Sequence, residues 1–222
     1  MTGSASANIR RAGMVVGIRL LPMIVMIGMS RPRILPALWA PLVLWTCWMV
    51  SEVWIEDRGA NRDARPSGWD QGSRLAILGG HLASAYLPAA ALVGGAASGE
   101  GWEFIVGLTV LGAGAILRLV AVATLGRLFT GHITVIAGQR LVCRGIFRHL
   151  RHPSYTGLFA INVGLAMALT SSPAVWVVVA IVSVATIGFR VRKEEGMLLR
   201  TLGDEYRAYR AATPGFLPIP FR

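Results

Sequence analysis

Residues 151–190 read RHPSYTGLFAINVGLAMALTSSPAVWVVVAIVSVATIGFR, and this stretch decides the fold. Its apolar part, 156–189, is too long for one straight membrane helix, because about 20 residues suffice to cross the hydrocarbon core. Ser171-Ser172-Pro173 interrupts the run, and proline both removes a backbone donor and disfavours helix in the residue before it. We therefore predict a tight hairpin of two short helices, 156–171 and 173–189.

The composition of the whole chain is that of a membrane protein. Of the 222 residues, 54% are hydrophobic and only 15% are charged, whereas a soluble domain is about 25% charged. Further apolar runs that could cross a bilayer lie at 13–30, 34–50, 75–97 and 102–124. The sequence thus predicts an all-α fold, a polytopic integral membrane bundle that ends in a helical hairpin.

The distribution of arginine predicts the orientation of this bundle. The net charge is +11, and the arginines collect in 51–74, in 125–155 and in the C-terminal tail, while the connector 98–101 has no basic residue. Positively charged loops stay on the cytoplasmic side of a membrane. We therefore expect a multi-pass protein of the cell (inner) membrane with both termini cytoplasmic. Arg31 and Arg33, in a predicted outside loop, count against this scheme.

Several classes of function are disfavoured by composition and motif spacing. A basic chain can bind nucleic acid, but a DNA-binding domain does not carry this much apolar sequence, so we expect membrane lipids as partners and no nucleic acid. Cys47 and Cys143 lie far apart, and no C-x-x-C or H-E-x-x-H spacing occurs, so no metal site is predicted. The preference for arginine over lysine also suggests a GC-rich bacterial gene.

The segment 125–155 is long for a connection without a function of its own. It is divided by four glycines, which let the backbone approach a ligand closely. Its polar side chains include His132, Gln139, Arg140, Arg144, Arg148, His149, Arg151, His152 and Tyr155. Either a solvated basic surface or a ligand-binding segment on the cytoplasmic face would have this composition.

His152-Pro153 marks the start of the next helix. Proline favours the first helical turn, and the residue before it is driven to extended backbone. Arg151 and His152 should therefore lie just outside a helix whose free N–H groups suit a carboxylate or a phosphate. Tyr155 would stand in the first turn, where it can stack on a flat ring or donate its hydroxyl. Contacts with lipid phosphate or a helix cap are the simpler alternatives.

The segment 190–212 is predicted to be an amphipathic surface helix, because apolar side chains recur at spacings of three and four residues. Arg190, Glu194 and Glu195 stand at its start, and Arg190 and Glu194 are four residues apart on one face. They follow directly on a membrane helix, where ionisable groups are costly and usually functional. Arg118, inside 102–124, either reaches to the membrane surface or faces the bundle.

At these residues the chain resembles the isoprenylcysteine carboxyl methyltransferase family over roughly residues 112 to 218. The shared pattern consists of Leu125-Gly126-Arg127, Phe129-Thr130, Gly138-Gln139-Arg140-Leu141-Val142, Gly145-Ile146-Phe147-Arg148, Arg151-His152-Pro153-Ser154-Tyr155-Thr156-Gly157, Arg190-x-x-x-Glu194-Glu195, Leu198, Gly203-Asp204-Glu205-Tyr206-x-x-Tyr209 and Pro214-x-x-Leu217-Pro218. Ile146-Phe147 departs from the family, which usually has Pro-Tyr there. Residues 1–97 carry no matching motif and would form the substrate side, and 98–222 would form the methyltransferase core.

The resemblance implies a membrane methyltransferase that uses S-adenosylmethionine, with the cofactor held at 125–157 and by the C-terminal helix. By the same resemblance, the cofactor-binding residues are Leu141, Val142, Arg151, His152, Pro153, Tyr155, Gly157 and a glutamate of the pair Glu194 and Glu195. Arg190, Glu194 and Glu195 are the implied catalytic residues. Arg118 and Arg190 would contact the acceptor, a lipophilic small molecule that enters from the bilayer.

Three questions about the reaction stay open at this point. The first choice of acceptor is a carboxylate, which is ionised at pH 7 and needs positioning more than a base, but a phospholipid amine or a thiol is possible. An NADPH-dependent intramembrane sterol or enone reductase shares a similar cytoplasmic motif, and the basic loop could hold its 2′-phosphate. A membrane scaffold without enzymatic activity is the third class, and it predicts no cofactor binding.

Overall fold

The computed structural model describes residues 28, 39–58, 70, 72–97, 101–130, 133 and 140–216, without the side chains of 53–58 and 127. The predicted first span, 13–30, and parts of the basic segments 51–74 and 125–155 lie outside these residues. Within them every regular element is helical, which confirms the all-α prediction. The elements are α2 (Trp39–Arg58), α3 (Ser73–Val93), α4 (Trp102–Leu125), η2 (Gly126–Leu128), η3 (Gly145–Arg148), α5 (Pro153–Leu169), α6 (Pro173–Leu202) and α7 (Asp204–Ala212).

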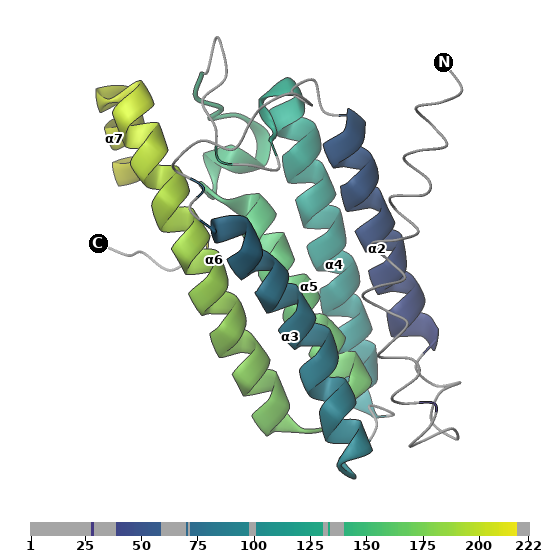
Figure 1. Cartoon of the computed structure of the whole chain (residues 1–222). Helices are drawn as coiled ribbons and strands as arrows, with labels where there is room; N and C mark the ends of the chain where they lie inside the picture. The colour runs from purple at the N-terminus through teal and green to yellow at the C-terminus, as the bar shows by residue number, and fades with distance from the viewer. Residues whose placement is uncertain are drawn as a thin grey trace.

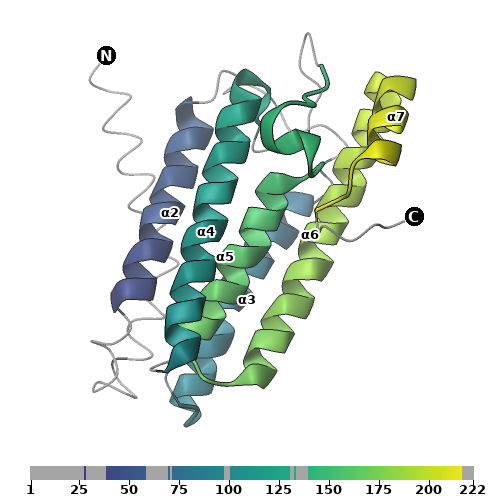
Figure 2. The same cartoon turned by 180° about the vertical axis from the view of Figure 1, so that it is seen from behind.

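The helices α2 to α6 run side by side as a bundle, and α7 follows the projecting end of α6 (Figures 1 and 2). The two central helices, α4 and α5, form the most extensive contact, and α3 packs on α5 and α6. We call the end at which α4 finishes and α5 begins the site end. The segment 140–152 lies there, between α4 and the junction of α6 with α7 (Figure 2).

Glycines allow α4 and α5 to approach backbone to backbone at two heights. Gly107 faces Gly164, and Gly114 faces Gly157, so each helix contributes two glycines seven residues apart. A Cβ atom on Gly107 would stand 2.5 Å from the Ala168 backbone nitrogen, and one on Gly157 would stand 2.6 Å from the Gly114 carbonyl oxygen. The hydrophobic effect cannot drive helix association in lipid. Close van der Waals packing between small residues holds such crossings together instead. This glycine seam fixes α5 relative to α4.

The predicted break at Ser171-Ser172-Pro173 is present, since α5 ends at Leu169 and α6 begins at Pro173. The turn is held by polar contacts to the end of α3 and the start of α4. Ser171 Oγ donates to Glu103 Oε1 at 2.5 Å, and the Thr170 hydroxyl donates to the Ala97 carbonyl oxygen at 3.1 Å. The Ser171 backbone N–H also donates to the Ala97 carbonyl oxygen at 3.1 Å, so this N–H has a partner although the helix has ended.

The second arm of the hairpin is longer than predicted. We expected a membrane helix over 173–189 followed by a separate amphipathic helix over 190–212, whereas α6 continues without interruption to Leu202. Its 30 residues span about 45 Å, which exceeds the ~30 Å hydrocarbon core. The helix therefore carries Arg190, Glu194 and Glu195 on the same rigid rod as its apolar part, and the break falls at Gly203, where φ is +54°.

The outer surface of the bundle is apolar, as expected of a membrane protein. Three described helices, α3, α4 and α6, are long and apolar enough to cross a membrane, and α5 is a shorter apolar helix. The predicted span 34–50 corresponds to α2. Large apolar side chains such as Ile105, Ile116 and Ile181 are more than 60% exposed on the outside of the bundle. Exposed apolar surface of this extent belongs in contact with lipid.

Candidate functional site at the basic end of the bundle

The first site residues lie where α5 begins. The helix starts at Pro153 as the His-Pro pair predicts, and His152 precedes it with non-helical backbone angles. His152 is buried, and its Nε2 lies 3.1 Å from Glu195 Oε1 of α6. Proline thus fixes the direction in which the chain enters α5, and this direction places the imidazole against α6.

Glu195 is the centre of a closed ionic cluster. Arg151 Nη1 lies 2.8 Å from its Oε1, and Arg210 Nε of α7 lies 3.4 Å from its Oε2. The Arg151 backbone N–H also donates to the Pro214 carbonyl oxygen at 2.9 Å. Three segments therefore meet on one buried carboxylate. Buried charges of this kind tolerate their environment only while their partners remain in place, so the cluster ties 151–152 and α7 to α6.

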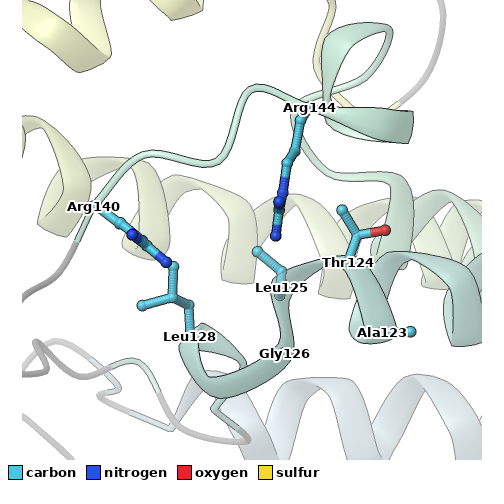
Figure 3. A pocket seen from close by; sticks show the side chains of 7 residues that line it. All are labelled: Ala123, Thr124, Leu125, Gly126, Leu128, Arg140 and Arg144. Atoms are coloured by element: carbon cyan, nitrogen blue, oxygen red, sulfur yellow. The ribbon is translucent and has the colours of Figure 1, made fainter.

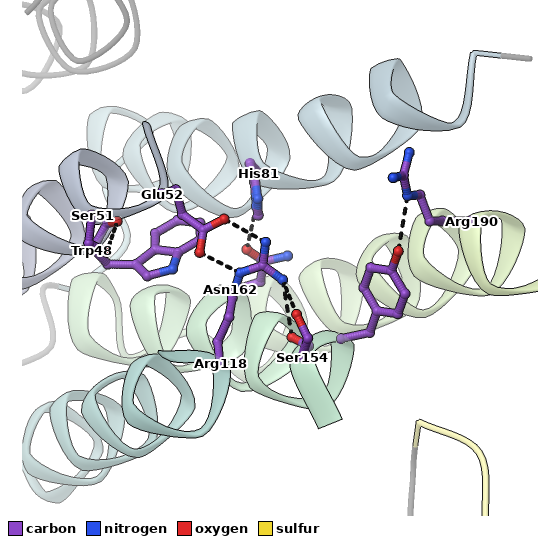
Figure 4. Close-up of polar contacts among 9 residues, drawn as sticks. Trp48, Ser51, Glu52, His81, Arg118, Ser154, Asn162 and Arg190 are labelled. Atoms are coloured by element: carbon purple, nitrogen blue, oxygen red, sulfur yellow. Dashed lines mark hydrogen bonds and ion pairs between the residues drawn. The ribbon is translucent and has the colours of Figure 1, made fainter. Parts of the chain in front are cut away.

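A second network surrounds Arg190, five residues before Glu195 on α6. Its Nη1 donates to Asp70 Oδ1 and to Ser73 Oγ, both at 2.9 Å. Its Nε donates to the Tyr155 hydroxyl at 3.0 Å, the contact drawn in Figure 4. The Tyr155 hydroxyl in turn donates to Glu194 Oε2 at 2.7 Å. One guanidinium thus joins the starts of α3 and α5 to α6, and Glu194 belongs to this network and not to that of Glu195.

Helix α7 covers the site with two tyrosines. Tyr206 is buried, and the Tyr209 hydroxyl donates to the Phe147 carbonyl oxygen of η3 at 2.6 Å. Burial raises the pKa of both phenols well above its ordinary value, so both stay protonated at neutral pH. The chain changes direction at Gly203, so α7 packs on the segment 140–152. The predicted spacing of apolar side chains over 190–212 therefore still gives one buried face, although two helices share it.

Arg118 faces the interior of the bundle and does not extend to the membrane surface. Its Nε and Nη2 bind the two oxygens of Glu52 on α2, at 2.6 and 2.5 Å, and its Nη1 donates to Ser154 Oγ at 2.6 Å (Figure 4). This bidentate pair neutralises a charge that would be costly inside the bundle. Arg118 therefore connects α2 with the first turn of α5.

The other predicted cofactor residues fall into two groups. Leu141 and Val142 lie half-buried in the segment 140–144, close in sequence to the site. Gly157 instead faces α4, as part of the glycine seam, and its surroundings are the backbone of Gly114 and Arg118. The structure thus places Gly157 in helix packing, although its position within the motif led us to expect a contact with the cofactor.

Two functional groups were missed from the sequence. Asp70 and Ser73 reach Arg190 across more than 110 residues, and only their position before the apolar run 75–97, typical of a helix start, was visible. His81 and Asn162 form a separate polar contact in the middle of the bundle, with His81 Nδ1 and Asn162 Oδ1 3.2 Å apart (Figure 4). Asn162 Nδ2 also donates to Ser183 Oγ at 3.1 Å.

Comparison with known proteins finds a family match over the part of the chain that carries this site. Residues 105–200, from the first turn of α4 almost to the end of α6, match the sequence model of the isoprenylcysteine carboxyl methyltransferase family. Residues 105–200 are therefore similar in sequence to that family. The matched range contains the glycine seam, Arg151, His152, Tyr155, Arg190 and both glutamates.

Curated members of this family are similar to the chain over about half of its length. Protein-S-isoprenylcysteine O-methyltransferase B of Arabidopsis thaliana is 33% identical over 120 residues, which are 53% of this chain and 60% of that protein. The Xenopus laevis protein-S-isoprenylcysteine O-methyltransferase is 31% identical over 121 residues, or 53% of this chain and 41% of that protein. The matches therefore span less than two thirds of these relatives.

A solved structure shows that the likeness in fold extends over nearly the whole chain. It is the eukaryotic intramembrane Ras methyltransferase (isoprenylcysteine carboxyl methyltransferase), with a TM-score of 0.55 at 20% sequence identity. The superposition covers 96% of this chain and 76% of that one. At this identity the comparison supports the membrane helical fold that the isoprenylcysteine carboxyl methyltransferase family shares.

Proposed function

We propose that this chain is an integral membrane methyltransferase that takes a methyl group from S-adenosylmethionine and transfers it to a lipophilic acceptor, by preference to a carboxylate. One observation carries the proposal. Within the family-matched range, Tyr155, Arg190 and Glu194 form one hydrogen-bonded network at the basic end of a bundle whose outside is apolar. A polar cofactor and a lipid-soluble acceptor can meet at such a junction.

The residues at the site end fit the cofactor chemically. Arg151 Nε and the Tyr206 hydroxyl are buried without a hydrogen-bond partner among the described residues, and buried polar groups of this kind normally have one. Both belong to the surroundings of Glu195: Arg151 Nη1 lies 2.8 Å from its Oε1, and the Glu195 carboxylate helps to raise the pKa of Tyr206. A zwitterionic amino-acid group offers a carboxylate to such donors and an ammonium to a carboxylate such as that of Glu194.

The sulfonium of the cofactor, when bound, supplies an electrophilic methyl group and needs no metal. The contribution of the protein is then alignment and the exclusion of water, which can lower the barrier by several kcal/mol. Arg190, with its planar fork, is the group best suited to hold the acceptor carboxylate. Tyr155 holds Arg190 and Glu194 in one geometry, because its hydroxyl accepts from the first and donates to the second.

Asp70 would compete with an acceptor carboxylate for Arg190. A carboxylate already lies 2.9 Å from Arg190 Nη1, in the position that an acceptor carboxylate would take. We propose that the acceptor shares Arg190 with Asp70 or displaces it. An amine acceptor is the second candidate, since Asp70 and Glu194 place two carboxylates around one guanidinium, and a cationic headgroup would be attracted there.

Binding and turnover measurements on the purified protein test this function. S-adenosylhomocysteine should raise the melting temperature and NADPH should not; stabilisation by NADPH alone would replace the methyltransferase with a reductase. Labelled S-adenosylmethionine and a bacterial lipid extract should give a labelled product, which mass spectrometry then identifies. A carboxylate acceptor predicts a rate without a titration near the amine pKa, whereas an amine acceptor predicts a rate that rises through it.

The proposed location is the cell (inner) membrane with the site end facing the cytoplasm. Cys143 is exposed at that end, and Cys47 lies in α2. In a C47S background, a membrane-impermeant maleimide should label Cys143 in inverted vesicles and not in intact spheroplasts. Labelling in spheroplasts would reverse the orientation.

A further inference from the structure

A pocket separate from the network of Arg190 lies at the end of α4. Its volume is about 380 Å³, and it is an open pocket lined by the last turn of α4, η2 and two arginines of the segment 140–144. Figure 3 shows Arg140 and Arg144 extending toward Leu125, Leu128 and Thr124 from the opposite side. Among the described residues, the lining contains no acidic side chain. The pocket is therefore basic on one wall and largely apolar on the other.

These two arginines differ from three largely buried arginines at the site end. Arg118, Arg151 and Arg190 each lie against a carboxylate within 3 Å. The guanidinium groups of Arg140 and Arg144 have neither an ion pair nor a hydrogen bond with the described residues, although they face the same cavity. Two adjacent cationic groups without counter-ions around a cavity favour the binding of an anion.

The apolar wall continues into the lipid-facing surface of the bundle. Ala123 lines the pocket, and Val120, Leu119 and Ile116 precede it by three, four and seven residues, so all four lie on one face of α4. These three side chains are 46%, 39% and 64% exposed. An anion bound by the arginines would thus lie at the end of an apolar strip that runs along α4.

We propose that this pocket binds an anionic phospholipid, with its phosphate between Arg140 and Arg144 and an acyl chain along Ala123, Val120, Leu119 and Ile116. Guanidinium groups bind phosphate in a bidentate manner, and arginines at the membrane surface attract anionic lipids. The inference is independent of the methyltransferase proposal, since none of these residues belongs to the Arg190 network. The bound lipid connects the end of α4 with the segment that leads to Arg151 and His152.

Lipid titrations of the full-length protein in a neutral detergent, followed by native mass spectrometry and by melting temperature, test the proposal. Phosphatidylglycerol should bind and stabilise, whereas phosphatidylcholine should bind more weakly and inorganic phosphate should have no effect. The double variant R140Q/R144Q should weaken phosphatidylglycerol binding roughly 30-fold, as expected for two arginine contacts. The control R148Q/R192Q removes two exposed charges elsewhere and should change binding less than twofold.

A substitution in the apolar strip tests whether the acyl chain lies along it. Val120→Gln should weaken binding of long-chain phosphatidylglycerol and leave binding of glycerophosphate unchanged. Equal loss in R140Q/R144Q and in R148Q/R192Q would overturn the proposal, because binding would then depend on net charge alone. Equal binding of inorganic phosphate and of phosphatidylglycerol would overturn it in favour of a phosphate site. Displacement of the lipid by S-adenosylhomocysteine would overturn it by assigning the pocket to the cofactor.

Discussion

Glu194 and Glu195 are neighbours on α6, yet the structure gives them different surroundings. Successive residues of a helix point about 100° apart, so the two carboxylates face different segments. Glu195 meets Arg151, His152 and Arg210 and is enclosed by basic groups. Glu194 meets the Tyr155 hydroxyl, which also accepts from Arg190. We infer that Glu195 holds the site together and that Glu194 belongs to the groups that contact ligands.

The largest expected effect comes from removing the cation of the Arg190 network. Arg190→Ala should lower turnover by about 1000-fold, because the acceptor loses its positioning group. Binding of S-adenosylhomocysteine, measured by calorimetry, should change little, and Arg190→Lys should recover part of the activity. The exposed Arg192→Ala serves as the control. Unchanged turnover in Arg190→Ala would remove this residue from the mechanism.

Removing the Glu195 carboxylate should lower the stability of the protein. Glu195→Ala leaves the buried Arg151 without its counter-ion, which costs about 3 kcal/mol, and the melting temperature should fall accordingly. The matched change Glu205→Ala, on an exposed side chain of α7, should leave the melting temperature unchanged. If Glu195→Ala kept the melting temperature and lost only cofactor affinity, the assignment of the two glutamates would be reversed.

A milder variant tests Glu194 in the same comparison. Glu194→Gln keeps the shape of the side chain and an acceptor for the Tyr155 hydroxyl, and it removes the charge proposed to receive the cofactor's ammonium. The dissociation constant for S-adenosylhomocysteine should rise about tenfold, the value of one charge-assisted hydrogen bond. The melting temperature without cofactor should stay within a degree or two of the original, which separates this variant from Glu195→Ala.

The smallest expected effect concerns Asp70. Asp70→Asn keeps a hydrogen-bond acceptor for Arg190 and removes the charge that competes with an acceptor carboxylate. For a probe such as an N-acetylated S-prenylcysteine, KM should fall a few-fold with kcat nearly constant. A rise in KM together with a lower melting temperature would mean that Asp70 serves only to anchor α3 to α6.

The local parts of this site could be predicted from the sequence. The start of α5 at Pro153 and the break before Pro173 follow from the chemistry of proline itself. The order of motifs predicted the similarity of residues 105–200 to the isoprenylcysteine carboxyl methyltransferase family. Gly203 was within the predicted helix 190–212, and a glycine at that point was the available signal for its break. The extension of α6 beyond 189 was missed because the change from apolar to charged residues was read as a helix boundary.

The long-range contacts could not be predicted in the same way. The pairs Arg190–Asp70 and Arg118–Glu52 join residues more than 60 positions apart, and nothing in either local pattern specifies its partner. Gly157 has the same limitation, since a glycine that admits a ligand and one that admits a neighbouring helix look alike in sequence. Only the packing of α5 against α4 distinguishes the two roles.

The glycine seam has a consequence for motion. Because α4 and α5 approach closely at two glycine pairs, where an added Cβ atom would meet the facing backbone, we expect the two helices to move as one unit. Any opening of the bundle toward the lipid must come from displacement of α2, α3 or α6. The central pair then serves as the stationary frame against which the rest of the protein moves.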